Sequence, residues 1–157
     1  MKKIILAIAM AIACSTVSAN EILSEGFESG ELIGWTVWKA MPNVKLQQSD
    51  AHSGEYSARF YKASGIERNI MLSPGKYMVT FYTKHVMGEG GTVAIKRKPQ
   101  DNWKFFDVAK QDVPLTPEYT KSTINFKVKN EGLYKIVIQA PHTRQFVIDD
   151  ILLEQIP

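Results

Sequence analysis

Cysteine is almost absent from this chain. Among its 157 residues Cys14 is the single cysteine, and it lies near the N-terminus. A lone thiol has no partner within the chain, so an intramolecular disulfide framework is excluded. We therefore expect a hydrophobic core, with or without a metal ion, to hold the fold together.

The chain also has no large excess of positive or negative charge. The chain has 19 basic and 16 acidic residues, and without Lys2 and Lys3 the balance is 17 to 16. Proteins that bind nucleic acid usually show a marked basic excess on the folded domain. We therefore expect no nucleic acid partner. The densest basic cluster, at 96–98, is interpreted as a solvated strand end or loop.

The motifs of common catalytic sites are missing too. The sequence has no Gly-x-Ser-x-Gly elbow, and His52, His85 and His142 occur singly rather than in a His-Glu-x-x-His spacing. The glycine-rich segment 88–91 lacks the Lys-Ser/Thr of a phosphate-binding loop and is typical of a hairpin turn. The sequence therefore favours a protein that is not an enzyme, although a carboxylate pair for glycoside cleavage would leave no such motif.

One long apolar run is present, at the N-terminus. Lys2 and Lys3 precede the apolar segment 4–13, and Val17-Ser18-Ala19 has the small-x-small pattern of a signal-peptidase site. The run is too short to span a bilayer. We predict a signal peptide over 1–19 and a single mature domain over 20–157, in a secreted or periplasmic protein.

Cys14 leaves a second kind of processing open. It follows Ala11-Ile12-Ala13, a segment that resembles a bacterial lipobox with Ala11 where leucine is expected. In that case the protein is a lipoprotein anchored to a membrane through Cys14. Simple secretion and lipid anchoring both remain open from the sequence.

The remaining sequence alternates between apolar and polar residues with a period of two. In the segment 76–86, Tyr77, Val79 and Phe81 alternate with Thr80, Tyr82 and Lys84. This pattern is typical of half-buried strands, and turn signals such as Ser73-Pro74-Gly75 separate the runs. We predict an all-β, antiparallel β-sandwich. The expected strands are 21–23, 36–38, 44–48, 56–61, 66–72, 76–86, 92–98, 103–109, 120–129, 134–140 and 145–154.

Several motifs, in this order and spacing, resemble a known family. They are Gly26-Phe27-Glu28, Gly34-Trp35, the segment 52–57, the turn 73–75 before a strand, and the closing segment 147–153 with its Asp149-Asp150 pair. Together they resemble carbohydrate-binding modules with a galactose-binding-like jelly roll, as in families 4, 9 and 22. The resemblance covers the chain from residue 20 onward. It implies a secreted, non-catalytic module whose partner is a polysaccharide or oligosaccharide.

The same resemblance implies a structural calcium ion. The matching positions are Glu28, the turn from Asp50 to Gly54 that includes Ser53, and Asp149 or Asp150. Calcium prefers carboxylate and carbonyl oxygens, and adjacent acids on a strand point to opposite faces, so one of the pair is buried. A buried carboxylate is costly without a partner. The alternative is an acid that accepts hydrogen bonds from the turn backbone without any ion.

We expect the sugar to bind on one open sheet face. Sugar binding typically uses flat aromatic rings, with amides and charges that reach the hydroxyl groups. Trp35 is expected in the core instead. The candidate ligand-binding residues are those that alternation turns outward, with one from the loop 99–104: Trp38, Asn69, Tyr82, Lys84, Trp103 and Gln139.

A different function for the same sandwich also stays open. A secreted or surface-anchored interaction domain would bind a surface protein instead of a glycan. We expect it to show a flat apolar or charged patch, whereas a glycan module should show two or more exposed aromatic residues that line one groove.

Overall fold

The computed structural model describes residues 19–99 and 104–157. The predicted signal peptide over 1–19, apart from Ala19, lies outside the described residues, as do Cys14 and the candidate Trp103. Among the described residues no helix is long and apolar enough to cross a bilayer.

The described residues form nine β-strands and no helix, which confirms the all-β prediction. All the strand pairings are antiparallel. The strands are β1 (Asn20–Glu25), β2 (Thr36–Gln47), β3 (Ser57–Leu72), β4 (Gly75–Met87), β5 (Thr92–Arg97), β6 (Phe106–Asp112), β7 (Thr120–Val128), β8 (Gly132–Ala140) and β9 (Gln145–Ile156).

Two pairs of expected strands are in fact single strands. The segments 36–38 and 44–48 both belong to β2, and the segments 56–61 and 66–72 both belong to β3. Irregularities in the β2–β3 register interrupt the alternation without ending either strand, and Ala63 in β3 has a φ of 49°. A bulge inserts an extra residue into one strand and bends it, so in the sequence it resembles a strand end.

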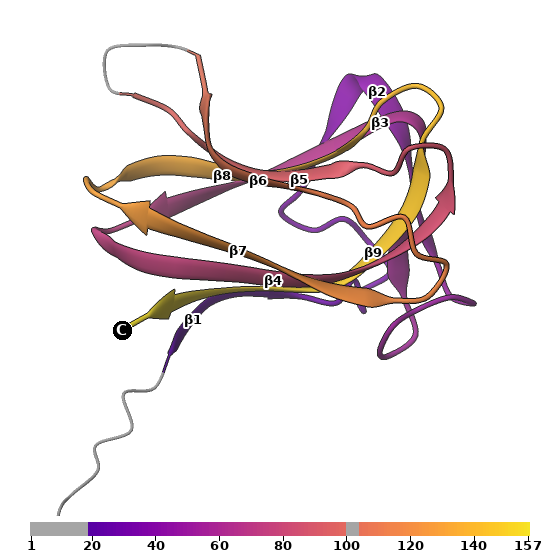
Figure 1. Ribbon diagram of the computed structural model, residues 1–157, viewed down its shortest axis with the longest axis horizontal. Helices are drawn as coiled ribbons and strands as arrows, with labels where there is room; N and C mark the ends of the chain where they lie inside the picture. The colour runs from indigo at the N-terminus through magenta and orange to yellow at the C-terminus, as the bar shows by residue number, and fades with distance from the viewer. Residues whose placement is uncertain (1–18, 100–103) are drawn as a thin grey trace, which may run out of the picture.

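The strands lie in two layers that join along one side (Figure 1). The layer at the top of Figure 1, here called the upper layer, contains β6, β5, β8 and β3, with β2 paired to β3. The lower layer contains β7, β4 and β9, with β1 paired to β9. The first part of β3 pairs with β9, so the two layers form one nearly closed sheet.

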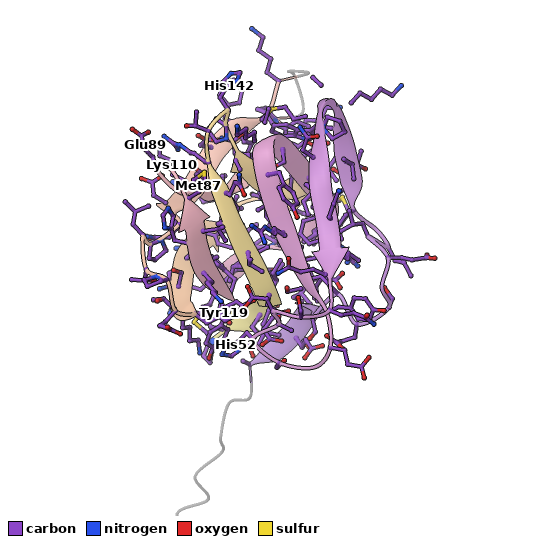
Figure 2. All side chains as sticks on the ribbon, turned by 90° about the vertical axis from the view of Figure 1, so that its right-hand side faces the viewer. His52, Met87, Glu89, Lys110, Tyr119 and His142 are labelled. Carbon is purple, nitrogen blue, oxygen red and sulfur yellow. The ribbon has the colours of Figure 1, made fainter. Side chains whose placement is uncertain are left out.

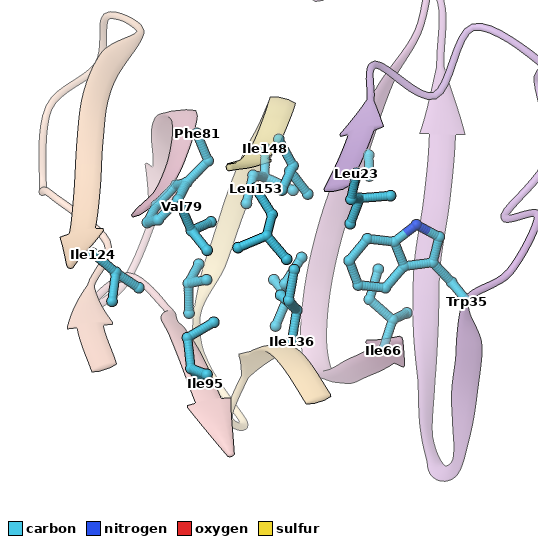
Figure 3. Packing of buried hydrophobic residues seen from close by; sticks show 14 of the residues in the cluster. Leu23, Trp35, Ile66, Val79, Phe81, Ile95, Ile124, Ile136, Ile148 and Leu153 are labelled. Atoms are coloured by element: carbon cyan, nitrogen blue, oxygen red, sulfur yellow. The ribbon is translucent and has the colours of Figure 1, made fainter. Parts of the chain in front are cut away.

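The hydrophobic core fills the space between the layers, as Figure 3 shows for part of it. In β4, Tyr77, Val79 and Phe81 are buried there, whereas Tyr82 is half-buried on the outer side. The predicted facing of this strand is therefore confirmed. Trp35 packs in the same core, with an exposed fraction of 7%, as expected.

Candidate functional site

The outer side of the upper layer carries a set of polar and aromatic side chains in aligned rows. In one row Asn69 on β3 pairs with Lys135 on β8, which pairs with Lys96 on β5. Because side chains alternate along a strand, every second row faces outward. We call this set the upper face. Its residues are Trp38, Gly65, Glu67, Asn69, Thr92, Ala94, Lys96, Phe105, Lys135, Val137 and Gln139.

Trp38 lies over the β3 backbone at a position where a glycine makes room for it. A β-carbon on Gly65 would lie only 2.5 Å from Cε3 of the Trp38 indole. The indole Nε1–H donates a hydrogen bond of 3.1 Å to Oε2 of Glu67. The ring of Trp38 is thus held against the sheet by close packing and by one directional bond to a charged acceptor.

Glu67 connects this indole to the other side of the face. Its second carboxylate oxygen, Oε1, forms an ion pair with the ammonium group of Lys135. The Lys135 ammonium also lies 4.1 Å from the centre of the Phe105 ring, a cation–π distance. An aromatic ring therefore stands at each end of a Glu67–Lys135 ion pair, and we call these four residues the aromatic–ionic row.

Small and aliphatic residues form the floor beside this row. Val137 and Ala94 point outward, yet their exposed fractions are only 1% and 5%. A buried residue on an outward-facing row is covered by its longer neighbours, so those neighbours lean over the sheet. Gln139 and Asn69 lie in the rows on either side of Val137, so both point outward beside the aromatic–ionic row.

Tyr82 and Lys84 do not belong to the upper face, which corrects one prediction. Both lie on β4 in the lower layer, so their outward direction is the opposite side of the molecule (Figure 1). The prediction that they share one open face with Trp38, Asn69 and Gln139 is wrong. Alternation shows that a side chain points away from the core, but it does not show from which layer.

Tyr82 and Lys84 also have partners of their own. The imidazole of His52 stacks on the Tyr82 ring, with 3.6 Å between ring centres, and Tyr119 contacts the same imidazole edge-on at 5.3 Å (Figure 2). The Lys84 ammonium lies 2.7 Å from Oδ1 of Asp50 in an ion pair. One face of the Tyr82 ring is therefore already occupied.

Phe105 is a member of the upper face that the sequence analysis did not single out. It lies two residues from the candidate Trp103, which is outside the described residues. The signal that could have found it is the aromatic run Phe105-Phe106 that follows the loop 99–104. Phe106 is more than half exposed, which marks this strand start as aromatic and accessible.

The acids proposed as calcium ligands meet the turn at 50–56, at the end of the molecule where Figure 2 labels His52. Asp149 is the buried member of the acid pair, with an exposed fraction of 0%, and its Oδ2 accepts the N–H groups of His52 at 2.8 Å and Ser53 at 3.3 Å. Asp150 is partly exposed and accepts the Ser53 hydroxyl at 2.7 Å. Burial raises the pKa of Asp149 to about 6, although the N–H donors of Asp150, His52 and Ser53 oppose the shift.

Glu28 contacts the same turn from another direction. Its two carboxylate oxygens accept the backbone N–H groups of Glu55 at 2.8 Å and Tyr56 at 3.1 Å. Gly54 has a φ of 62°, and a β-carbon there would lie 2.4 Å from the Glu28 carboxyl carbon, so this turn requires glycine. Glu28, Asp149 and Asp150 together hold the turn by its backbone and side-chain donors.

These oxygens are not arranged as a calcium cage. Calcium takes about six to eight oxygen ligands, whereas here the carboxylates of Glu28 and Asp149 face N–H donors and Asp50 faces the Lys84 ammonium. Within 19–99 and 104–157 no group of three or more His, Cys, Asp or Glu side chains is placed to hold a metal ion. Calcium binding itself stays a prediction.

Comparison with known proteins relates this chain to solved structures only. No protein-family model matches it, and no curated protein matches its sequence. The family 61 module TmCBM61, solved in complex with β-1,4-galactotriose, is 24% identical with a TM-score of 0.62, and the match covers 84% of this chain and 95% of that one.

Two further solved carbohydrate-binding modules are also similar in structure to this chain. The CBM22-1 xylan-binding domain of Paenibacillus barcinonensis Xyn10C is 16% identical, with a TM-score of 0.68 and coverage of 88% of this chain and 96% of that chain. A family 16 carbohydrate-binding module is 17% identical, with a TM-score of 0.66 and coverage of 85% and 99%. The expected resemblance to carbohydrate-binding modules is confirmed, and the chain has their antiparallel, galactose-binding-like jelly-roll fold.

Proposed function

We propose that this protein is a non-catalytic carbohydrate-binding module that binds a polysaccharide or oligosaccharide on its upper face. The observation that carries the proposal is the aromatic–ionic row, in which the rings of Trp38 and Phe105 stand at the two ends of the Glu67–Lys135 ion pair. The jelly-roll fold, shared with modules solved with galactotriose or named as xylan-binding, supports it.

The chemistry of the row suits a sugar chain. A pyranose ring has an apolar side of C–H groups and a rim of hydroxyl groups. Aromatic faces carry negative charge density and attract the slightly positive C–H groups, while convergent polar groups orient the ligand. Trp38 supplies the ring, and Glu67, Lys135 and Gln139 supply an acceptor, a donor and an amide within the neighbouring rows.

The row also favours binding over hydrolysis. Cleavage of a glycosidic bond uses two carboxyl groups, one on each side of the bond. Glu67 accepts from the Trp38 indole with one oxygen and pairs with the Lys135 ammonium through the other. Each oxygen keeps a further lone pair that can accept a ligand hydroxyl, and we assign Glu67 to ligand binding.

The proposal includes export of the protein. The predicted leader 1–19 supports a secreted or periplasmic location, with a lipoprotein anchored through Cys14 as the alternative. Either location would expose the upper face to polysaccharide outside the cytoplasm.

The test compares matched variants on opposite sides of the molecule. Wild-type protein, Trp38→Ala and Tyr82→Ala are screened on a glycan array and by affinity electrophoresis in gels that contain β-1,4-galactan or xylan. We expect Trp38→Ala to lose retardation in the gel that retards the wild type, and Tyr82→Ala to keep it. Each variant removes one aromatic side chain. A loss of binding in Trp38→Ala alone therefore reflects the position of the ring on the upper face and not the removal of an aromatic residue in general.

Two outcomes would contradict the proposal. If Tyr82→Ala loses glycan binding while Trp38→Ala keeps it, the binding site is on the lower layer. If no glycan on the array or in either gel binds the folded wild type, the protein-interaction alternative takes its place.

A further inference from the structure

A groove away from the upper face is lined by two lysines and by no acidic residue. It has a volume of about 460 Å³ and lies where β2, β3 and β9 meet, with Lys45, Tyr61, Lys62, Asn43 and Gln145 among its lining residues. These three strands lie along the side of the molecule that faces the viewer in Figure 2. Its volume falls within the range of about 300–1,000 Å³ that is usual for small-ligand sites.

Two cations lie near the Tyr61 ring at this groove, and a third lines the groove beside it. Arg59 precedes Tyr61 on β3 by two residues, and its guanidinium carbon lies 5.0 Å from the centre of the ring. Lys45 is paired with Arg59 across the β2–β3 ladder, and its ammonium lies 5.8 Å from the same ring centre. Lys62 is next in sequence and lines the groove as an exposed side chain. We call Lys45, Arg59 and Lys62 the basic cluster.

The basic cluster has no counter-ion within the described part of the chain. Six ion pairs are formed by residues 19–99 and 104–157, and none includes Lys45, Arg59 or Lys62. Of the other described arginines, Arg68 and Arg144 each pair with a glutamate, whereas Arg97 on β5 has no ion pair among the described residues and also has a buried Nε without a partner. Like charges this close repel one another, and an anion that bridges them would relieve the repulsion.

Arg59 in addition keeps a buried donor without an acceptor. Its Nε is buried and, among the described residues, has no hydrogen-bond partner, while its terminal nitrogen donates only a long bond of 3.4 Å to Oε1 of Gln145. A buried donor without an acceptor is destabilising, and more so when it is charged. The Nε atom is itself covered by the protein, so a ligand carboxylate would pair with the terminal nitrogens of the guanidinium, which can form two parallel hydrogen bonds.

The other lining groups indicate what carries the anion. Besides the cations, the groove presents the Tyr61 ring and the side-chain amides of Asn43 and Gln145. Asn43 is fixed in place because its amide nitrogen donates to the carbonyl oxygens of Lys62 at 2.8 Å and Ala63 at 3.3 Å, which leaves its own amide oxygen for a ligand hydroxyl. Amides and an aromatic ring beside cations suit a hydroxylated anion better than a bare phosphate group.

We propose that this groove is a second binding site that takes an acidic saccharide, a sugar unit whose carboxylate is held by the basic cluster. The site is independent of the upper face, because its cations lie on the outer sides of β2 and β3 before the irregular segment at Ala63, while the upper face uses β3 after it. Neutral sugar would bind at the upper face and uronate at the groove.

The test measures binding of trigalacturonate and of neutral β-1,4-galactotriose by calorimetry. A double variant, Lys45→Gln with Lys62→Gln, removes both exposed lysines of the groove. We expect its affinity for trigalacturonate to be at least about tenfold lower than that of the wild type, with galactotriose binding unchanged. The control is Lys129→Gln, an exposed lysine outside the groove, which should change affinity by less than about twofold. Raising salt from about 50 to about 300 mM should weaken trigalacturonate binding in the wild type.

Arg59→Lys provides a second measurement, since it keeps the charge and most of the packing but removes the two-pronged guanidinium. We expect it to lower trigalacturonate affinity by at least about threefold, with an unchanged melting temperature. Trp38→Ala should leave trigalacturonate binding intact even where it abolishes neutral-sugar binding, so failure here and failure of the proposed function are separate results.

The proposal is overturned by any of three results. Trigalacturonate does not bind the wild type, or it binds the double lysine variant as tightly as the wild type, or inorganic phosphate or vesicles that contain phosphatidylglycerol displace it at equal or lower concentration. The last result would identify a general anion site or a lipid surface in place of an acidic saccharide.

Discussion

Gly65→Ala is the sharpest perturbation of the upper face, because it adds one methyl group directly beneath the proposed sugar platform. The new β-carbon would lie 2.5 Å from Cε3 and 2.8 Å from Cδ2 of Trp38. Carbon atoms pack at about 3.5–4.0 Å, so the indole has to move by roughly 1 Å or more. Such a shift stretches the 3.1 Å bond from the indole to Glu67.

The same change should leave the fold intact. Gly65 is not among the residues with positive φ, so alanine fits its backbone, and alanine in a strand loses less conformational entropy on folding than glycine. The clash falls on the indole ring of the half-exposed Trp38, which can rotate away, and not on backbone. We therefore expect the melting temperature to change little, while the aromatic platform is displaced.

The expected loss in glycan binding is about 1–2 kcal/mol, or roughly fivefold to thirtyfold in Kd, because a displaced aromatic anchor loses most of its contact with the ligand. Calorimetry on wild type, Gly65→Ala, Trp38→Ala and the double variant measures it, with the tightest-binding glycan of the array as ligand. If the methyl group acts only through Trp38, Gly65→Ala should have no further effect once Trp38 is alanine.

Two results would refute this reasoning. One is a Gly65→Ala variant that binds as tightly as the wild type. The other is an equal loss from Gly65→Ala whether or not Trp38 is present, since the methyl group would then act on the ligand or the sheet and not through the indole.

Three further predictions concern the core, the turn and the leader. Phe81→Ala should lower the free energy of unfolding by about 3–5 kcal/mol in urea titrations, because Phe81 is fully buried, whereas Tyr82→Ala should lose only about 0.5–1.5 kcal/mol, the stack with His52; equal losses would contradict the facing of β4. If calcium binds the folded state, a chelator should lower the melting temperature and added calcium should restore it; identical melting curves would show that Glu28, Asp149 and Asp150 hold the turn without an ion. Mass spectrometry of exported protein should find an N-terminus at Asn20, and a lipid-modified Cys14 would instead establish the anchored form.

The sequence alone was sufficient for the class of fold and for the direction of most side chains. Alternation placed Val79 and Phe81 in the core and turned Tyr82 outward, and burial confirms each assignment. The resemblance to carbohydrate-binding modules also implied that Glu28 and the Asp149-Asp150 pair lie near the turn at 50–54. In the structure Asp149 accepts the Ser53 N–H, and Glu28 accepts the N–H of Glu55 directly after this turn. These properties depend on residues close together in the chain or on a motif preserved as a unit.

The tertiary structure alone decided which outward residues share a surface. Trp38 and Tyr82 both point away from the core, but strand pairing places β2 in the upper layer and β4 in the lower layer. It also brought together Lys45 with Arg59, and Lys135 with Phe105, which are far apart in sequence. A period of two is a local property of one strand, whereas the order of strands in a sheet depends on packing between distant segments. For this reason the pattern of residues predicted outward positions correctly and combined two opposite faces into one.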